Sequence, residues 1–251
     1  MADDRRRRVG IVVPPRHFDT TWQELTELDQ SIDVLTTQMR MDPSFDFSLD
    51  EIASAADEIE ACSTSLVEAG AELVLELGTP FSTVHGWAEA NELRERIERT
   101  SGAPFEMMGL SVVQAVHAFG ASTVAMATGY YDQSWIDRYS DFVTGSGLEI
   151  SSAQSFADQG HFPTAEAAFE ASFHGFSDDL IAASIQEVAD NDPTADVILV
   201  PGMPGRILRL IPGLESSVGR PVASYFSIWW KGRSRLGLAG VSGFGQLLAR
   251  A

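Results

Sequence analysis

The sequence predicts an α/β fold in which parallel strands alternate with helices and two similar domains face each other. Three observations support this. Short apolar runs alternate with longer amphipathic segments, which is the pattern of parallel βαβ units. Some runs are apolar throughout, such as ADVILV at 195–200, which indicates strands covered on both faces. The order strand, helix, strand, helix also occurs twice. Pro14 and Thr128 follow the first strand of each repeat and are 114 residues apart, and Gly78 and Gly202 follow a later strand of each repeat and are 124 residues apart.

The first half of the chain begins with a buried strand that ends at Pro14-Pro15, because proline cannot donate to a sheet ladder. Later helices in this half end at Gly70 and Gly120, since glycine adopts the left-handed conformation found after helix ends. The predicted strands are 8–13, 32–38, 72–77 and 104–108. The predicted helices are 48–70, 80–99 and 111–119.

The second half repeats this alternation. Its predicted strands are 122–128, 148–152, 195–200 and 221–224. Its predicted helices are 131–145, 164–173, 177–189 and 206–218, and the chain from Phe226 onward is mostly helical. Right-handed crossovers between such units give a doubly wound arrangement, in which ligands bind outside the carboxyl ends of the strands.

Composition excludes several classes of protein. The 251 residues include 17 basic and 36 acidic ones, for a formal net charge of −19, whereas nucleic-acid binding needs a basic surface. Cys62 is the only cysteine, which suits a reducing compartment and excludes an intrachain disulfide. No apolar run is long enough for a signal peptide or a membrane span. We therefore expect a cytoplasmic protein without nucleic-acid or membrane partners, while a homo-oligomer stays open.

No cofactor or metal motif occurs. A G-x-G-x-x-G or Walker sequence follows none of the predicted strands, and no histidine pair has the H-x-x-x-H spacing of a zinc site. A G-x-S-x-G elbow is also missing, so a hydrolase triad has no support. The sequence thus predicts a site that uses neither metal nor cofactor.

Gly78-Thr79-Pro80 follows a predicted strand and opens a helix. Exposed amides and a hydroxyl at such a position can bind carboxylate or phosphate oxygens. The alternative, a glycine turn in which Thr79 is a helix N-cap, has about equal weight. Tyr130 and Tyr131 follow a strand of the second half, where their hydroxyls can donate to a carboxylate, although single aromatic residues more often pack in a core.

The segment Pro201–Arg206 follows the strand at 195–200 and contains two prolines and two glycines. Its backbone can approach a ligand closely at Gly202 and Met203. Arg206 opens the next helix, where a positive charge is unfavourable to the helix dipole. This mildly favours a binding role for Arg206 over an ordinary solvated or paired arginine.

Four segments together resemble the aspartate/glutamate racemase superfamily, and most of all its arylmalonate decarboxylase and maleate cis–trans isomerase branch. They are GIVVPP (10–15), LELGTPFS (75–82), AMATGYYD (125–132), and ADVILVPG, IPGLE and RPVAS within 195–224. The resemblance implies two flavodoxin-like (Rossmann-like) parallel-sheet domains related by a pseudo-twofold axis, with the active-site cleft between them. It also implies domains of residues 1–113 plus 222–251, and 114–221.

The resemblance further implies a cofactor-independent reaction at carbon beside a carboxylate. Gly78, Thr79 and Pro80 would hold that carboxylate together with Tyr130, and Pro14 and Pro15 would line the cleft. The superfamily's thiols correspond to Gly78 and Gly202, neither of which is cysteine, and Cys62 lies in the middle of a predicted helix. Thiol catalysis is therefore excluded, and Pro80 lacks the amide hydrogen that a serine would supply.

Three functions stay open at this point. The first is a lyase or isomerase for a small carboxylic acid, with an aromatic or bulky group, that uses a proton donor other than a thiol. Tyr130 is the first choice for this donor, and His85, whose reference pKa of about 6.5 suits acid–base work, is the second. The others are a hydratase or hydrolase that holds a water at Gly202, and a non-catalytic carboxylate-binding protein.

Overall fold

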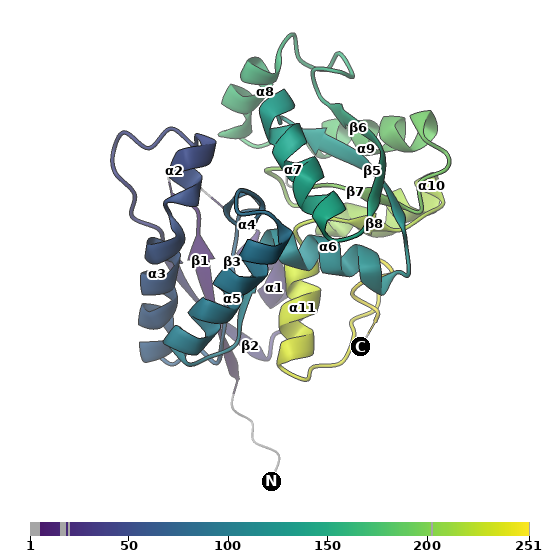
Figure 1. The fold of residues 1–251 in the computed structure, drawn as a ribbon. Helices are drawn as coiled ribbons and strands as arrows, with labels where there is room; N and C mark the ends of the chain where they lie inside the picture. The colour runs from purple at the N-terminus through teal and green to yellow at the C-terminus, as the bar shows by residue number, and fades with distance from the viewer. Residues whose placement is uncertain (1–5, 16–18, 20, 202, 251) are drawn as a thin grey trace.

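The computed structural model describes residues 6–15, 19, 21–201 and 203–250 of the chain. Within these residues the strands form two four-stranded sheets, ordered β2-β1-β3-β4 and β6-β5-β7-β8, in which every neighbouring pair is parallel (Figure 1). The second order repeats the first, which confirms the predicted α/β fold and its internal repeat. The strands are β1 (Arg7–Val13), β2 (Ile32–Gln38), β3 (Leu73–Glu76), β4 (Phe105–Met107), β5 (Thr123–Gly129), β6 (Glu149–Ser155), β7 (Val197–Leu199) and β8 (Val222–Ala223).

Helices connect the strands and cover both sheets. Among those described, none is both long and apolar enough to cross a bilayer. In the first half they are α1 (Trp22–Leu28), α2 (Leu49–Ala53), α3 (Ala56–Glu68), α4 (Pro80–Thr83), α5 (Trp87–Ser101) and α6 (Met108–Ala118). In the second half they are α7 (Gln133–Gly145), α8 (Ala165–Ser172), α9 (Asp178–Asn191), the 3-10 helix η1 (Leu208–Leu210), α10 (Ile211–Val218) and α11 (Ser227–Arg235).

The helices differ from the sequence prediction in five places. In the described residues after Phe226 only α11 is α-helical, so this part of the chain is not mostly helical as expected. The helix expected to open at Arg206 begins instead at Leu208, as η1, so Arg206 precedes the helix. Helix α1 was not expected. The helix expected over 48–70 is divided into α2 and α3, although Ile52, Ala55 and Ile59 are all buried; the apolar spacing continues across the break and so does not reveal it. The helix expected over 80–99 is divided into α4 and α5 by Gly86, whose φ of 78° is incompatible with a continuous helix.

The central strands of each sheet are covered on both faces, as their uninterrupted apolar sequences predict. In the first sheet, Gly10 of β1 lies against α3, where an added Cβ would be 3.0 Å from Leu66 Cβ. On the opposite face, Gly232 of α11 lies against β3, where an added Cβ would be 3.2 Å from side-chain atoms of Leu73 and Leu75. Glycine at both positions permits close approach of helix and sheet.

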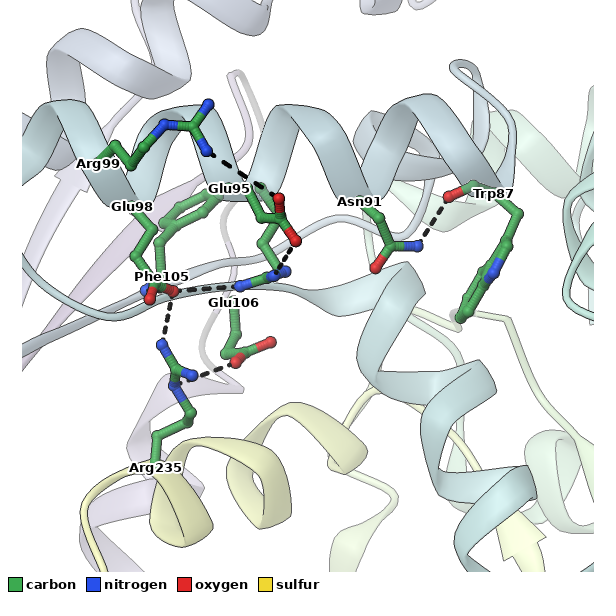
Figure 2. A network of polar contacts seen from close by, with 9 residues as sticks. Trp87, Asn91, Glu95, Glu98, Arg99, Phe105, Glu106 and Arg235 are labelled. Atoms are coloured by element: carbon green, nitrogen blue, oxygen red, sulfur yellow. Dashed lines mark hydrogen bonds and ion pairs between the residues drawn. The ribbon is translucent and has the colours of Figure 1, made fainter.

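The carboxyl-terminal helix α11 returns to the first sheet after β8 has completed the second. It packs against α6, β3 and β4, and Figure 1 shows it beside α6. Figure 2 shows the polar contacts that fix it there. Arg235 of α11 pairs with Glu98 of α5 at 2.5 Å and with the buried Glu106 of β4 at 3.4 Å, and Glu98 also accepts from the Phe105 amide. The chain therefore passes from the first sheet to the second through α6 and returns to the first sheet with α11.

Candidate active site

A cavity of about 330 Å³ lies where the strands of both halves end. Pro14 follows β1 and Gly78 follows β3, while Tyr130 follows β5 and Met203 follows β7, and all four line this cavity. Ligands of parallel sheets bind at this edge. The pseudo-twofold arrangement thus brings four strand ends of the two halves to one cavity.

The turn after β3 is built from backbone in a conformation that favours glycine. Gly78 has a φ of 116°, and an added Cβ would lie 2.7 Å from Phe81 Cδ2 and 3.1 Å from Pro14 Cγ. Thr79 is 1% exposed, and its hydroxyl donates to the carbonyl of Pro201 rather than capping α4. This bond joins the end of β3 to the segment after β7, so the turn is fixed by the opposite half of the molecule.

The two tyrosines after β5 line the cavity with their rings 5.1 Å apart and nearly perpendicular. Burial raises the pKa of Tyr130 to about 12. Burial also raises the pKa of Tyr131 well above its ordinary value, partly opposed by a side-chain hydrogen bond with Thr79. Both phenols are therefore protonated near neutral pH, which makes them donors of hydrogen bonds and protons rather than bases.

One wall of the cavity is aromatic and is built from both halves. Phe47 precedes α2, whereas Phe169 and Phe173 lie one turn apart at α8, and ring centroids are 6.5 Å apart for Phe47–Phe169 and 6.3 Å for Phe47–Phe173. The ring of Tyr130 lies 5.8 Å from that of Phe169. Phe47 has a φ of 64°, which is rare for a bulky residue and typical of functional sites. This wall was not predicted from the sequence, in which the i, i+4 spacing of Phe169 and Phe173 was its only signal.

Another part of the cavity lining is polar and depends on contacts with α1. Arg206 donates to Gln23 and pairs with Glu27 at 3.3 Å. The Tyr225 hydroxyl donates to Glu24 Oε2 at 2.6 Å. Arg206 and Tyr225 both line the cavity. Burial raises the pKa of the Glu24 carboxyl to about 7. Because α1 was not expected from the sequence, neither were these contacts.

The structure brings most of the predicted site residues together. Those on the cavity wall are Pro14, Gly78, Thr79, Pro80, Tyr130, Tyr131, Met203 and Arg206. Pro15 and His85, both in the described part of the chain, do not line it. His85 lies close to Glu89 and Arg96, and burial lowers its pKa. Gly202 lies outside the described residues.

Cys62 is buried in α3 and does not line the cavity. Its Sγ lies 3.7 Å from Glu58 Oε1, and burial raises the pKa of the thiol to about 11. The thiol is thus protonated at neutral pH and unreactive as a nucleophile. Across the described residues, no group of three or more His, Cys, Asp or Glu side chains is placed to hold a metal ion.

Comparison with known proteins decides the family. The model of the arylmalonate decarboxylase family matches residues 9–248. The chain belongs to the arylmalonate decarboxylase family. No curated protein sequence matches it with significance.

Solved structures of family members and of maleate isomerases have the same fold. Unliganded arylmalonate decarboxylase superposes with a TM-score of 0.79 at 21% identity, over 98% of this chain and 100% of that one. The maleate isomerase Iso from Pseudomonas putida gives 0.77 at 20% identity, over 97% and 98%. Nocardia farcinica maleate cis–trans isomerase bound to Tris gives 0.76 at 21% identity, over 97% and 98%. These likenesses extend over the whole chain and establish the two-sheet architecture.

Proposed function

We propose that this member of the arylmalonate decarboxylase family is a cofactor-independent lyase or isomerase that acts at carbon beside a carboxylate without using a thiol. Its substrate is a small carboxylic acid with an aromatic or bulky apolar substituent. The observation that carries the proposal is the cavity, whose lining combines the Gly78-Thr79-Pro80 turn and the two tyrosines with the aromatic rings of Phe47, Phe169 and Phe173. The polar groups suit a carboxylate, and the aromatic rings suit an apolar substituent.

The chemistry needs two things from the protein. Loss of carbon dioxide or of a proton beside a carboxylate leaves an enediolate, whose negative oxygens need hydrogen-bond donors. The carbon then needs a proton. Tyr130 is the proposed proton donor, because burial keeps its phenol protonated and the side chain lines the cavity. The same burial makes Tyr130 a poor base, so protonation of an enediolate fits it better than removal of a proton.

Two departures from the thiol chemistry of the superfamily support this assignment. Gly78 stands at one thiol position, where a Cβ would clash with Phe81. Gly202 stands at the other position, and the single cysteine of the chain is the unreactive Cys62. A donor other than sulfur is therefore required for turnover.

The proposal is tested with the purified chain and three substrates. Phenylmalonate reports decarboxylation, maleate reports isomerisation, and phenylacetate in D₂O reports exchange of the proton beside the carboxylate. We expect turnover of phenylmalonate, and at least a tenfold lower rate for Tyr130→Phe; exchange of phenylacetate should be slower, because it requires removal of a proton. His85→Ala should lower the rate less, because His85 is not on the cavity wall. Binding of these acids without any turnover would instead identify a binding protein.

A gain-of-function variant separates the donor assignment from the reaction. If Tyr130→Phe is neutral and Gly202→Cys creates decarboxylase activity, Tyr130 is not the donor. The natural protein would then use a bound water as the proton donor, or it would bind carboxylic acids without catalysing a reaction.

A further inference from the structure

Two segments far apart in the chain meet at the polar wall of the cavity. Glu24 of α1 and Tyr225, which follows β8, are 201 residues apart. Tyr225 is 3% exposed and lines the cavity, and Glu24 is 2% exposed behind it. The Tyr225 hydroxyl donates to Glu24 Oε2 at 2.6 Å and accepts from the Ile207 amide at 2.9 Å. Contacts from both halves of the molecule therefore hold the Tyr225 hydroxyl and the Glu24 carboxyl in place.

The charged groups around Glu24 come from its own helix and from the segment after β7, where Arg209 as well as Arg206 lies within electrostatic reach of its carboxyl. Glu27 disfavours its ionised form, whereas Arg206, the Leu208 backbone and Tyr225 favour it. Burial outweighs these favourable contacts, so the pKa of the carboxyl is raised to about 7. Glu24 therefore changes its protonation state within the physiological pH range.

The two protonation states use the phenol differently. A phenol has one hydrogen and two lone pairs. When Glu24 is ionised, it accepts the phenol hydrogen. When Glu24 is protonated, its own O–H can donate to the phenol oxygen. The Glu24 O–H and the Ile207 amide then fill both lone pairs of that oxygen. The phenol hydrogen is left free for another acceptor. Tyr225 lines the cavity, whereas Glu24 does not.

We propose that Tyr225 is a further substrate-binding residue whose hydroxyl donates to the substrate carboxylate when Glu24 is protonated, and that Glu24 is its positioning residue. One proton moves between solvent and Glu24, the phenol O–H reorients, and no covalent bond of Tyr225 changes. The inference rests on the proposed function, since it requires a carboxylate in the cavity. It assigns recognition of that carboxylate to the α1 wall in addition to the turn after β3.

The test measures phenylacetate binding by calorimetry at pH 6 and pH 8. A carboxyl with a pKa of about 7 is mostly protonated at pH 6 and mostly ionised at pH 8, so wild-type affinity should fall about tenfold. Glu24→Gln, a neutral isostere of the protonated carboxyl, should bind at pH 8 as tightly as at pH 6. Tyr225→Phe should bind weakly at both pH values, and thermal melting checks that each variant is folded.

His174 and Asp19 also line the cavity, so the wild-type pH profile alone does not identify Glu24. Glu27→Gln is the matched control, because it removes a carboxylate one turn along the same helix. It should keep a pH dependence of binding, with its midpoint moved to lower pH, since Glu27 disfavours ionisation of Glu24. The same pH dependence in Glu24→Gln as in wild type, or full affinity of Tyr225→Phe at pH 6, would overturn the inference alone. If wild-type protein binds none of the carboxylates at either pH, the proposed function fails and the inference fails with it.

Discussion

The two halves of the molecule share one strand order but build their strand ends differently. In the first half, Gly78 has a φ of 116° and is enclosed by Phe81 and Pro14. In the second half, Gly129 has a φ of 63°, and its nearest neighbour is the flexible side chain of Met203. The first half thus contributes a rigid backbone turn, whereas the second contributes the large side chains of Tyr130, Tyr131, Met203 and Arg206. The shared strand order therefore determines where the cavity lies, but it does not determine which half supplies the large side chains that line it.

The sharpest test of this difference installs a cysteine at each glycine. Gly78→Cys should lower the free energy of unfolding by about 2–6 kcal/mol, because a strained backbone and an overpacked side chain each cost roughly 1–3 kcal/mol. Gly129→Cys should cost about 1–2 kcal/mol, since its φ is near the allowed left-handed region and Met203 can move. Urea unfolding measures both values.

Gly102→Cys is the control for these variants. Gly102 has a φ of 79° and open space around the position of a Cβ, so its substitution reports the backbone cost alone. Equal destabilisation at positions 78 and 102 would mean that the packing of Phe81 and Pro14 does not restrict the turn after β3.

A buried carboxyl also distinguishes the halves. Glu76 lies two residues before Gly78, and Val200 lies two residues before Gly202; both are fully buried. The carboxyl group of Glu76 has no side-chain partner among the described residues, and burial raises its pKa well above the ordinary value, opposed only by a contact with the Met108 backbone. The first half therefore carries a desolvated acid where the second carries a valine.

Replacing this acid should stabilise the protein. A folded-state pKa above the unfolded value means that the stability contribution of Glu76 is greatest below about pH 4.5 and is lost as pH rises. Glu76→Leu should therefore raise the free energy of unfolding by about 1–3 kcal/mol at pH 8, and by less at pH 5. Glu106→Leu, which removes a buried acid that is paired with Arg235, should give no such gain. A Glu76→Leu effect that does not change with pH would contradict this account.

Most of the fold and half of the site follow from local sequence. Uninterrupted apolar runs predict the strands, and parallel strands must end at one edge, so the sequence alone is enough to bring Gly78, Thr79, Tyr130 and Tyr131 together at the cavity that they line. The same reasoning predicted a cleft shared by both halves.

The remainder depends on contacts between distant segments. Phe47 precedes a helix rather than forming a recognisable motif, and Glu24 lies on a short helix whose seven residues have too little periodicity to be predicted. His85 illustrates the opposite error. It lies close to the Thr79 turn in sequence, but the break at Gly86 leaves it beside Glu89 and Arg96, off the cavity wall.

Replacing the Thr79 hydroxyl with a methyl group should weaken the contact between the two halves at the cavity. Thr79→Val removes the donor to the Pro201 carbonyl, and phenylacetate affinity should fall about tenfold, because the turn loses a buried hydrogen bond worth about 1 kcal/mol and its link with Tyr131. Thr83→Val is the control, since Thr83 is equally buried in α4 and its hydroxyl bonds within that helix, to Thr79 and Pro80. Equal affinity of the two variants would mean that Thr79 serves the fold alone.

The smallest effect is expected at the only cysteine, which belongs to the first half. Cys62 lies in α3, away from the cavity wall, and its buried thiol has a pKa of about 11, so it is neither a nucleophile nor a proton donor for the substrate. Cys62→Ser should therefore keep the turnover rate within about twofold, at a stability cost of about 1 kcal/mol for burying a hydroxyl. Iodoacetamide should likewise leave the native protein active. Loss of turnover in a Cys62→Ser protein that melts normally would show that sulfur takes part after all, and the asymmetry between a rigid first half and a chemically active second half would have to be reversed.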